Sequence, residues 1–292
     1  LFDGWEEHKR LLRPLDADLS TWNIDLELLK DYIDFRKYLK TTILVVHNLG
    51  NIINVPELKR KYPDFTFLED NCEGFLGKYE GQYSGTASFA SAISFFGNKN
   101  ITCGEGGAFI CQDEDVFEYI KCVHGQGQSD KRFVHSELGY NYRMTNIQAA
   151  LLYGQLEILP EILEKKHDLF ETYRKHVSGK DGVFAQVSDP TTQHSNWMFG
   201  VRVPGSTYKV AEEFFKQNKV EIRPMFYPVS SHRYLDRTSL GEFRRSTSYG
   251  NEKNAKILNK SCFILPSFPS LSKDEVNHIL ATLDNYLIYT SA

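Results

Sequence analysis

The chain has 292 residues, of which 41% are hydrophobic and 25% are charged, and its formal net charge is −4. This length can bury a sizeable core and is enough for two domains. The slightly acidic balance, the lack of a basic run and the lack of an apolar stretch of about 18 residues give no reason to expect nucleic acid or a membrane as a partner.

The first part of the chain alternates between predicted helices and strands. Asp25 is the expected N-cap of a helix over 26–32, and an aliphatic run over 42–47 predicts a strand covered on both faces. A helix over 55–62 and a strand over 65–68 follow. This alternation favours an α/β fold with a parallel sheet.

Two further strands are expected over 92–96 and 107–112, followed by a helix over 116–123. In parallel α/β sheets, ligands bind beyond the carboxyl ends of the strands. Asp70 and Lys99 both come just after predicted strands, so we expect them at this edge of the sheet.

The second half of the chain reads as helical at first and then as α+β. Thr145 and Gln148 form a capping-box pattern that opens a helix reaching Leu159, and Ser272 and Glu275 form another. The remaining predicted elements are a helix over 161–176, a strand over 197–203, a helix over 208–218, a strand over 220–223 and a terminal helix over 271–289. We predict a large domain over 1–165 and a smaller α+β domain over 166–292.

Five cysteines are scattered along the chain without a C-x-x-C pair: Cys72, Cys103, Cys111, Cys122 and Cys262. An odd number without metal-type spacing argues against a disulfide framework and against a zinc site. We therefore expect free thiols in a cytoplasmic protein that binds no metal.

Lys99 lies on a glycine-rich turn at the end of the apolar run 92–96. A lysine taken alone is usually solvent-exposed. A lysine held at a strand end can instead be desolvated, which lowers its pKa and makes it nucleophilic toward a carbonyl, the first step to a Schiff base. Asp70 lies in the acidic cluster 69–73 after another strand, and a pyridoxal phosphate site needs such a carboxylate to keep the pyridine nitrogen protonated.

Three motifs carry a resemblance to a known family. They are Glu69-Asp70-x-x-Glu73, then Ser94-Phe-Phe-Gly-Asn-Lys99-Asn-Ile-Thr-x-Gly-Glu-Gly-Gly107, then Gly139-Tyr-Asn-Tyr-Arg-Met-Thr-Asn-Ile-Gln148. Together they resemble the DegT-type sugar-nucleotide aminotransferases, and most closely the perosamine synthase branch. The resemblance runs from about Leu15 to the C-terminus.

The resemblance implies a fold-type I enzyme that depends on pyridoxal 5′-phosphate, with a mixed, mostly parallel sheet between helices in the large domain. The family's phosphate-binding glycine–threonine loop precedes these motifs and is not visible, so we expect the N-terminal part of the large domain to be missing. Related enzymes with histidine in place of Lys99 resemble dehydratases, so this lysine indicates amino transfer.

The resemblance also assigns roles to individual residues. Lys99 would bond to the cofactor and later move the proton, and Asp70 would pair with the pyridinium nitrogen. Glu73 matches the position beside the ring hydroxyl, and Ser94 matches a phosphate ligand. Asn141 matches a residue that reaches the cofactor phosphate of a neighbouring subunit, which implies a homodimer with shared sites. A surface acid, a backbone-bonded hydroxyl and a turn asparagine remain the alternatives for Glu73, Ser94 and Asn141.

The expected substrate residues are Arg223, Tyr227 and Trp197, with a structural ion pair as the alternative for Arg223. The expected reaction moves an amino group, with glutamate as donor, to the 4-keto carbon of a GDP-linked 4-keto-6-deoxyhexose. Ser230 and Ser231 stand near where the branch often has histidine, which leaves the sugar open. The alternatives are a UDP- or dTDP-linked sugar and a non-catalytic scaffold of the same fold. A nicotinamide-dependent enzyme lacks the expected glycine turn.

Overall fold

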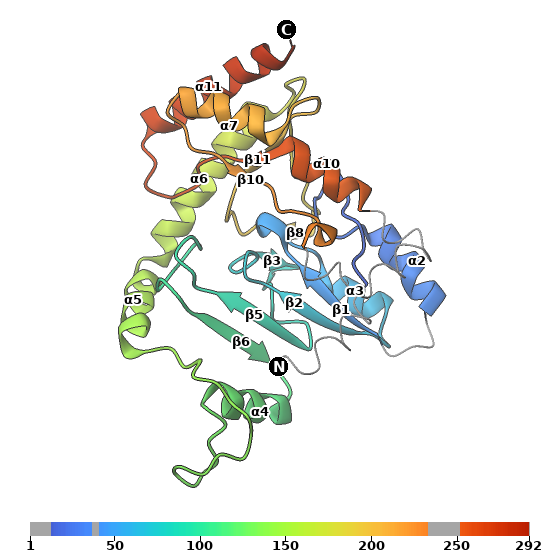
Figure 1. The fold of residues 1–292 in the computed structure, drawn as a ribbon, viewed down its shortest axis with the longest axis vertical. Coiled ribbons are helices and arrows are strands. Elements are labelled where there is room, and N and C mark those ends of the chain that lie inside the picture. The colour runs from blue at the N-terminus through green and yellow to red at the C-terminus, as the bar shows by residue number, and fades with distance from the viewer. Residues whose placement is uncertain (1–12, 37–40, 233–251, 292) are drawn as a thin grey trace. The chain divides into compact units, whose positions relative to one another are not determined.

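A computed structural model describes residues 13–36, 41–232 and 252–291 (Figure 1). The described residues form two compact units. The first, called the sheet unit, contains residues 41–164 and 189–197. The second, called the terminal unit, contains residues 13–36, 165–188, 198–232 and 252–291.

These units differ from the predicted ranges 1–165 and 166–292 in two segments. Residues 13–36 belong to the terminal unit, and residues 189–197 belong to the sheet unit. The second difference matters for the site, because Trp197 ends the segment that joins the sheet unit.

The sheet unit is built on a four-stranded sheet in the order β1-β2-β5-β6. The strands β1, β2 and β5 are parallel, and β6 runs antiparallel to β5 (Figure 1). Helix α3 connects β1 to β2, and the mostly parallel α/β sheet that the sequence predicted is confirmed. The bounds are Thr42–Val46 for β1, Val55–Lys61 for α3, Thr66–Asp70 for β2, Ala90–Ser94 for β5 and Gly107–Cys111 for β6.

The prediction that the first strand is covered on both faces is wrong for the described residues. Ile43 and Val45 are buried, but Leu44 is 56% exposed and Val46 is 41% exposed. Successive side chains of a strand point to opposite faces. A continuous aliphatic run therefore reveals a strand but does not show that both of its faces are covered.

A small hydrophobic cluster supports the turn that carries Lys99. Ile93 and Phe95 precede the lysine, Ile101 and Cys103 follow it, and all four side chains are buried together. Because both flanks of the turn are packed, the exposed part of the turn has a rigid base. The other elements of the sheet unit are η1 (Asn48–Gly50), β3 (Lys78–Tyr79), β4 (Gln82–Tyr83), α4 (Glu114–His124), α5 (Asn146–Glu157) and β8 (Thr192–Gln193).

The terminal unit combines helices with a four-stranded antiparallel sheet in the order β10-β11-β9-β7. Its core is rich in aromatic residues, among them Phe215, Phe263 and Tyr286. The combination of helices with an antiparallel sheet agrees with the expected α+β fold of this part of the chain. The elements are α2 (Leu26–Arg36), β7 (Phe184–Ala185), β9 (Gly200–Arg202), α7 (Tyr208–Gln217), β10 (Arg223–Pro224), η2 (Val229–Ser231), α10 (Lys253–Ser261), β11 (Cys262–Ile264) and α11 (Lys273–Ser291). Helix α6 (Leu159–Val177) passes from the sheet unit into the terminal unit.

The predicted helix starts are confirmed by their capping hydrogen bonds. Asp25 accepts from the backbone N–H of Glu27 at 2.9 Å, and Thr145 forms a capping box with Gln148. Such caps satisfy backbone donors that a helix start leaves unpaired. None of the described helices is long and apolar enough to cross a membrane.

Candidate active site

Lys99 is presented by a short turn that is closed by backbone hydrogen bonds. Phe95 donates to the carbonyl of Gly106 at 2.9 Å, and Cys103 donates to the carbonyl of Phe95 at 3.0 Å. Gly104, at φ +85°, adopts a conformation that favours glycine. The chain therefore leaves β5, forms the turn that carries Lys99 and returns to the sheet as β6.

The Lys99 amine is half-buried beside the end of β2. Burial lowers the pKa of Lys99, and the nearby Glu73, Cys72 and Asp70 act in the opposite direction. The structure thus brings Lys99, Asp70 and Glu73 together, as the two motifs predicted. An amine with a lowered pKa is a better nucleophile toward a carbonyl at neutral pH.

Glu73 and Asp70 are held differently. Glu73 accepts a hydrogen bond of 2.7 Å from the backbone N–H of Leu49. Burial raises the pKa of Glu73 to about 7, against the effects of that hydrogen bond and of the charge on Lys99. Asp70 accepts from the backbone N–H of Cys72 at 3.1 Å.

Ser94 lies on the same face of the sheet as Asp70. Asp70 is paired with Ala92, and Ser94 is two residues further along β5, so the three side chains point to one side. The Ser94 hydroxyl accepts from the backbone N–H of Phe96 at 3.2 Å.

The remaining predicted residues lie in three different settings. Asn141 is exposed and forms an isolated β-bridge with Gly125, and no described contact joins it to Lys99. Trp197 is buried with the Lys99 amine over its ring. Arg223 and Tyr227 belong to the terminal unit, where both are exposed.

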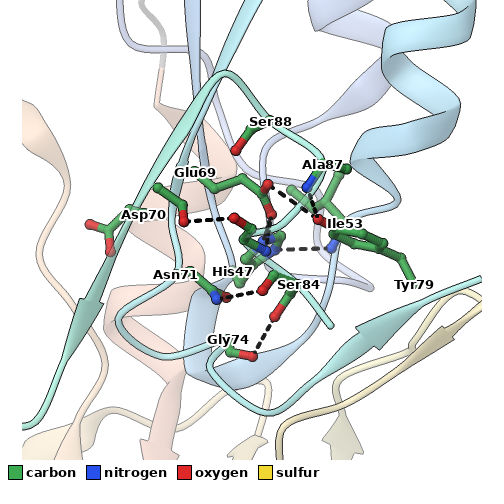
Figure 2. A network of polar contacts seen from close by, with 12 residues as sticks. His47, Ile53, Glu69, Asp70, Asn71, Gly74, Tyr79, Ser84, Ala87 and Ser88 are labelled. Atoms are coloured by element: carbon green, nitrogen blue, oxygen red, sulfur yellow. Dashed lines mark hydrogen bonds and ion pairs between the residues drawn. The ribbon is translucent and has the colours of Figure 1, made fainter. Parts of the chain in front are cut away.

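A buried hydrogen-bonded pair behind the site was not predicted from the sequence (Figure 2). His47 and Glu69 are fully buried, with 2.8 Å between Nε2 and Oε2. Nδ1 of His47 accepts from the backbone N–H of Ile53 at 3.1 Å. The imidazole proton therefore lies on Nε2 and is donated to Glu69. Burial alone would raise the pKa of Glu69, but the hydrogen bonds to this carboxylate hold it below its usual value.

Tyr79 extends this network on the side away from Asp70. Its hydroxyl accepts from the backbone N–H groups of Thr86 and Ala87 at 3.1 and 2.9 Å. Figure 2 shows that Asp70 points to the opposite side of its strand from Glu69. The sequence did offer a positional signal, since His47 ends one predicted strand and Glu69 directly follows the next one along the chain.

The residues at this edge fit a pyridoxal phosphate site. A lysine with a lowered pKa lies beside carboxylates that could face a cationic ring nitrogen, and Ser94 offers a hydroxyl on the same face. No group of three or more potential metal ligands is present among the described residues. The lysine and the carboxylates beside it suit carbonyl and amine chemistry.

Comparison with known proteins decides the family. Residues 12–284 match the profile of the DegT/DnrJ/EryC1/StrS aminotransferase family. The chain belongs to this family. It is a sugar aminotransferase, and its cofactor is pyridoxal 5′-phosphate.

Several relatives are similar over most of the chain. GDP-perosamine synthase of Escherichia coli O157:H7 is 31% identical over 280 residues, which is 93% of this chain and 72% of that protein. GDP-perosamine synthase of Vibrio cholerae is 31% identical over 86% of this chain and 68% of that protein. The structure of E. coli GDP-4-keto-6-deoxy-D-mannose-3-dehydratase with bound hydrated PLP superposes with a TM-score of 0.78 at 24% identity, covering 92% of this chain and 73% of the other. This last similarity supports the fold.

Proposed function

We propose that this sugar aminotransferase moves an amino group from glutamate to the 4-keto carbon of a GDP-linked 4-keto-6-deoxyhexose. The observation that carries the proposal is the half-buried Lys99, whose lowered pKa suits an amine that must react with a carbonyl. The similarity to two GDP-perosamine synthases supports GDP as the nucleotide.

Each residue of the cluster has a proposed task. Bound pyridoxal phosphate supplies an electron sink for the electrons of the substrate carbon. Nζ of Lys99 holds the cofactor and, once released by the amino donor, moves the proton at that carbon. Asp70 orients the ring through its nitrogen, Glu73 faces the ring hydroxyl, and Ser94 binds the phosphate.

The substrate is proposed to be bound by Arg223, Tyr227 and Trp197. A guanidinium binds phosphate oxygens in pairs, which suits Arg223 to a nucleotide diphosphate. Tyr227 offers a hydroxyl for a sugar oxygen. The exposure of Arg223 and Tyr227 in the terminal unit leaves both side chains accessible to a ligand.

A homodimer with shared sites is also proposed. Helix α5 has no fully buried residue, and most of its apolar side chains are exposed, with Ile147 at 77%. Exposed apolar surface of this kind marks protein interfaces. Asn141 lies in the loop before this helix and is proposed to reach the cofactor phosphate of the partner subunit.

The free state of all five cysteines supports a cytoplasmic location for the protein. Disulfides persist in oxidising compartments and are rare where thiols are kept reduced. Accordingly, we propose that the chain acts where nucleotide sugars and glutamate are both available.

The Lys99→Ala variant tests the chemical part of the proposal. We expect the wild-type protein to show a visible cofactor band that glutamate shifts, and to aminate a GDP-linked 4-keto-6-deoxyhexose in preference to its UDP- and dTDP-linked counterparts. The variant should lose the band, the borohydride-fixed cofactor label and the amino transfer, because the amine that bonds to the cofactor is gone.

Lys121→Ala is the matched control, since this exposed lysine pairs with Glu118 on α4. Full amino transfer by Lys99→Ala would remove the proposed mechanism. A preference for a UDP- or dTDP-linked sugar would keep the mechanism and correct the nucleotide. A band that no donor shifts would favour a non-catalytic protein.

A further inference from the structure

The segment His194–Trp197 crosses behind the turn of Lys99, although it lies about 100 residues later in the chain. It belongs to the sheet unit. Ser195 anchors one end of this segment: its backbone N–H donates to the carbonyl of Gly50 at 2.9 Å, and its hydroxyl donates to the carbonyl of Glu73 at 2.6 Å. The segment is therefore fixed to the carboxylate side of the site.

The other end of the segment is fixed to the lysine turn. The indole N–H of Trp197 donates to the carbonyl of Asn98 at 2.8 Å. The side-chain amide of Asn100 donates to the carbonyl of Ser195 at 2.8 Å. The two residues that flank Lys99 are thus both bonded to this segment, and Trp197 itself is only 5% exposed.

Between these two anchors lies the Lys99 side chain. Its Nζ is 3.9 Å from the centre of the Trp197 ring. An ammonium over an aromatic face is attracted by the ring quadrupole, and tryptophan gives the strongest such contact. The contact grows stronger as the cation is desolvated, and this amine is half-buried.

We propose that Trp197 is a positioning residue for Lys99, whose ring holds the lysine ammonium beside the carboxylates while its indole N–H fixes the turn at Asn98. This inference deepens the proposed function and rests on the proposed role of Lys99. It assigns to Trp197 a task toward the lysine, in addition to the expected contact with substrate.

The proposal predicts an effect on the charged state of the amine. The groups that face Lys99 are Glu73, Cys72 and Asp70, and burial opposes them. The ring of Trp197 favours the ammonium, as the carboxylates do. Removing the ring while keeping an apolar side chain in its place should therefore lower the pKa of Lys99 further, by about half a unit or more.

The test measures the pKa of Lys99 in the full chain after the cofactor has been removed with hydroxylamine. The rate of acetylation of Lys99 by acetic anhydride is followed against pH by mass spectrometry, with the exposed Lys209 as internal reference. Trp197→Leu should lower the pKa, and Trp197→Phe, which keeps an aromatic face, should restore most of the wild-type value. Equal shifts in both variants, or a rise in Trp197→Leu, would overturn the proposal.

Fluorinated tryptophan provides a second measurement that does not depend on how a smaller side chain packs. Fluorine withdraws electrons from the ring and weakens its attraction for a cation while nearly preserving its size. Increasing fluorination should lower the pKa of Lys99 stepwise. The chain has three tryptophans, so Trp197→Phe grown with the same analogue is the control and should not respond.

An unchanged pKa across the fluorinated series would show that Trp197 only fills space, and the proposal would fail. This readout needs no turnover. It therefore separates failure of the positioning role from failure of the proposed function, which the amino transfer assay of Lys99→Ala decides.

Discussion

At the scale of single residues, burial and charge act in opposite directions on Glu73 and Lys99. Burial raises the pKa of Glu73 to about 7, and it lowers the pKa of Lys99. The charge of each group opposes the shift of the other. The site therefore combines a carboxyl group that binds a proton near neutral pH with an amine that releases its proton more easily than usual.

Glu73→Gln should change the pH dependence of stability. The unfolded chain ionises Glu73 near pH 4.5, whereas the folded protein keeps it protonated up to about pH 7. Between these values the folded state binds more protons, so the free energy of unfolding falls as pH rises. Glutamine does not ionise, so the free energy of unfolding of the variant does not fall for this reason, and its side-chain oxygen can still accept from the N–H of Leu49. Urea unfolding measures the free energy of unfolding of the variant minus that of wild type. We expect this difference to be more favourable to the variant at pH 8 than at pH 4.5, by at most about 3 kcal/mol.

Glu105→Gln is the control for this measurement, because Glu105 is exposed on the glycine-rich turn. The difference in the free energy of unfolding between Glu105→Gln and wild type should not depend on pH. If Glu73→Gln gave the same difference at pH 4.5 and pH 8, the raised pKa of Glu73 would be refuted.

At the scale of elements, the turn after β1 links the buried pair of His47 and Glu69 to the site. His47 accepts from the N–H of Ile53, which closes a loop over Leu49 and Gly50, whose φ angles are 56° and 98°. The N–H of Leu49 then points at Glu73. Removing one partner of a buried hydrogen bond leaves the other partner unsatisfied, which is costly, so His47 and Glu69 keep this loop in one conformation.

Gly50→Ala should disrupt this element. The conformation at φ +98° disfavours any side chain, and a Cβ at this position would lie 2.1 Å from the hydroxyl of Ser195. We expect a loss of about 2 kcal/mol or more in the free energy of unfolding. Urea denaturation measures it.

Gly81→Ala is the matched control, since Gly81 has a similar φ of +81° and a Cβ at this position would have nothing within 4 Å. Gly81→Ala introduces backbone strain without a steric contact, and it should lower the free energy of unfolding by about 1 kcal/mol. Equal losses in the two variants would mean that the contact with Ser195 adds nothing.

At the scale of the whole molecule, the proposed dimer explains why α5 carries apolar residues that are exposed among the described parts of the chain. Leu151, Tyr153 and Ile158 are exposed on or just after this helix, in addition to Ile147. The same association would bring Asn141 of one subunit to the site of the other. Oligomeric state and activity are then coupled through the shared sites.

Mixing two inactive variants tests the sharing of sites. Lys99→Ala and Asn141→Ala should each be strongly impaired. In co-expressed hybrids, one site carries both defects and the other carries neither, so an equal mixture should recover about a quarter of wild-type activity. The amino transfer assay measures this recovery, with each variant expressed alone as control. No recovery would place Asn141 in the site of its own subunit, and full activity of Asn141→Ala alone would remove its role.

The sequence by itself determined the features that depend on local patterns. Three features follow from periodicity and capping chemistry: the position of Asp70 and Lys99 at or after strand ends, the mostly parallel sheet, and the capping box at Thr145. The motifs also indicated the family and the carboxylates beside the lysine. The strand expected over 92–96 was found over Ala90–Ser94, and Phe95, which follows the strand, packs in the cluster below the turn.

Only the tertiary structure decided which distant segments meet. The contact of Trp197 with Lys99 and the pairing of His47 with Glu69 join residues that are 98 and 22 positions apart. The exposure of Leu44 and the place of residues 189–197 in the sheet unit were likewise set by packing. Local patterns record what each segment prefers, whereas these contacts depend on how the backbone brings segments together, and no periodicity encodes that.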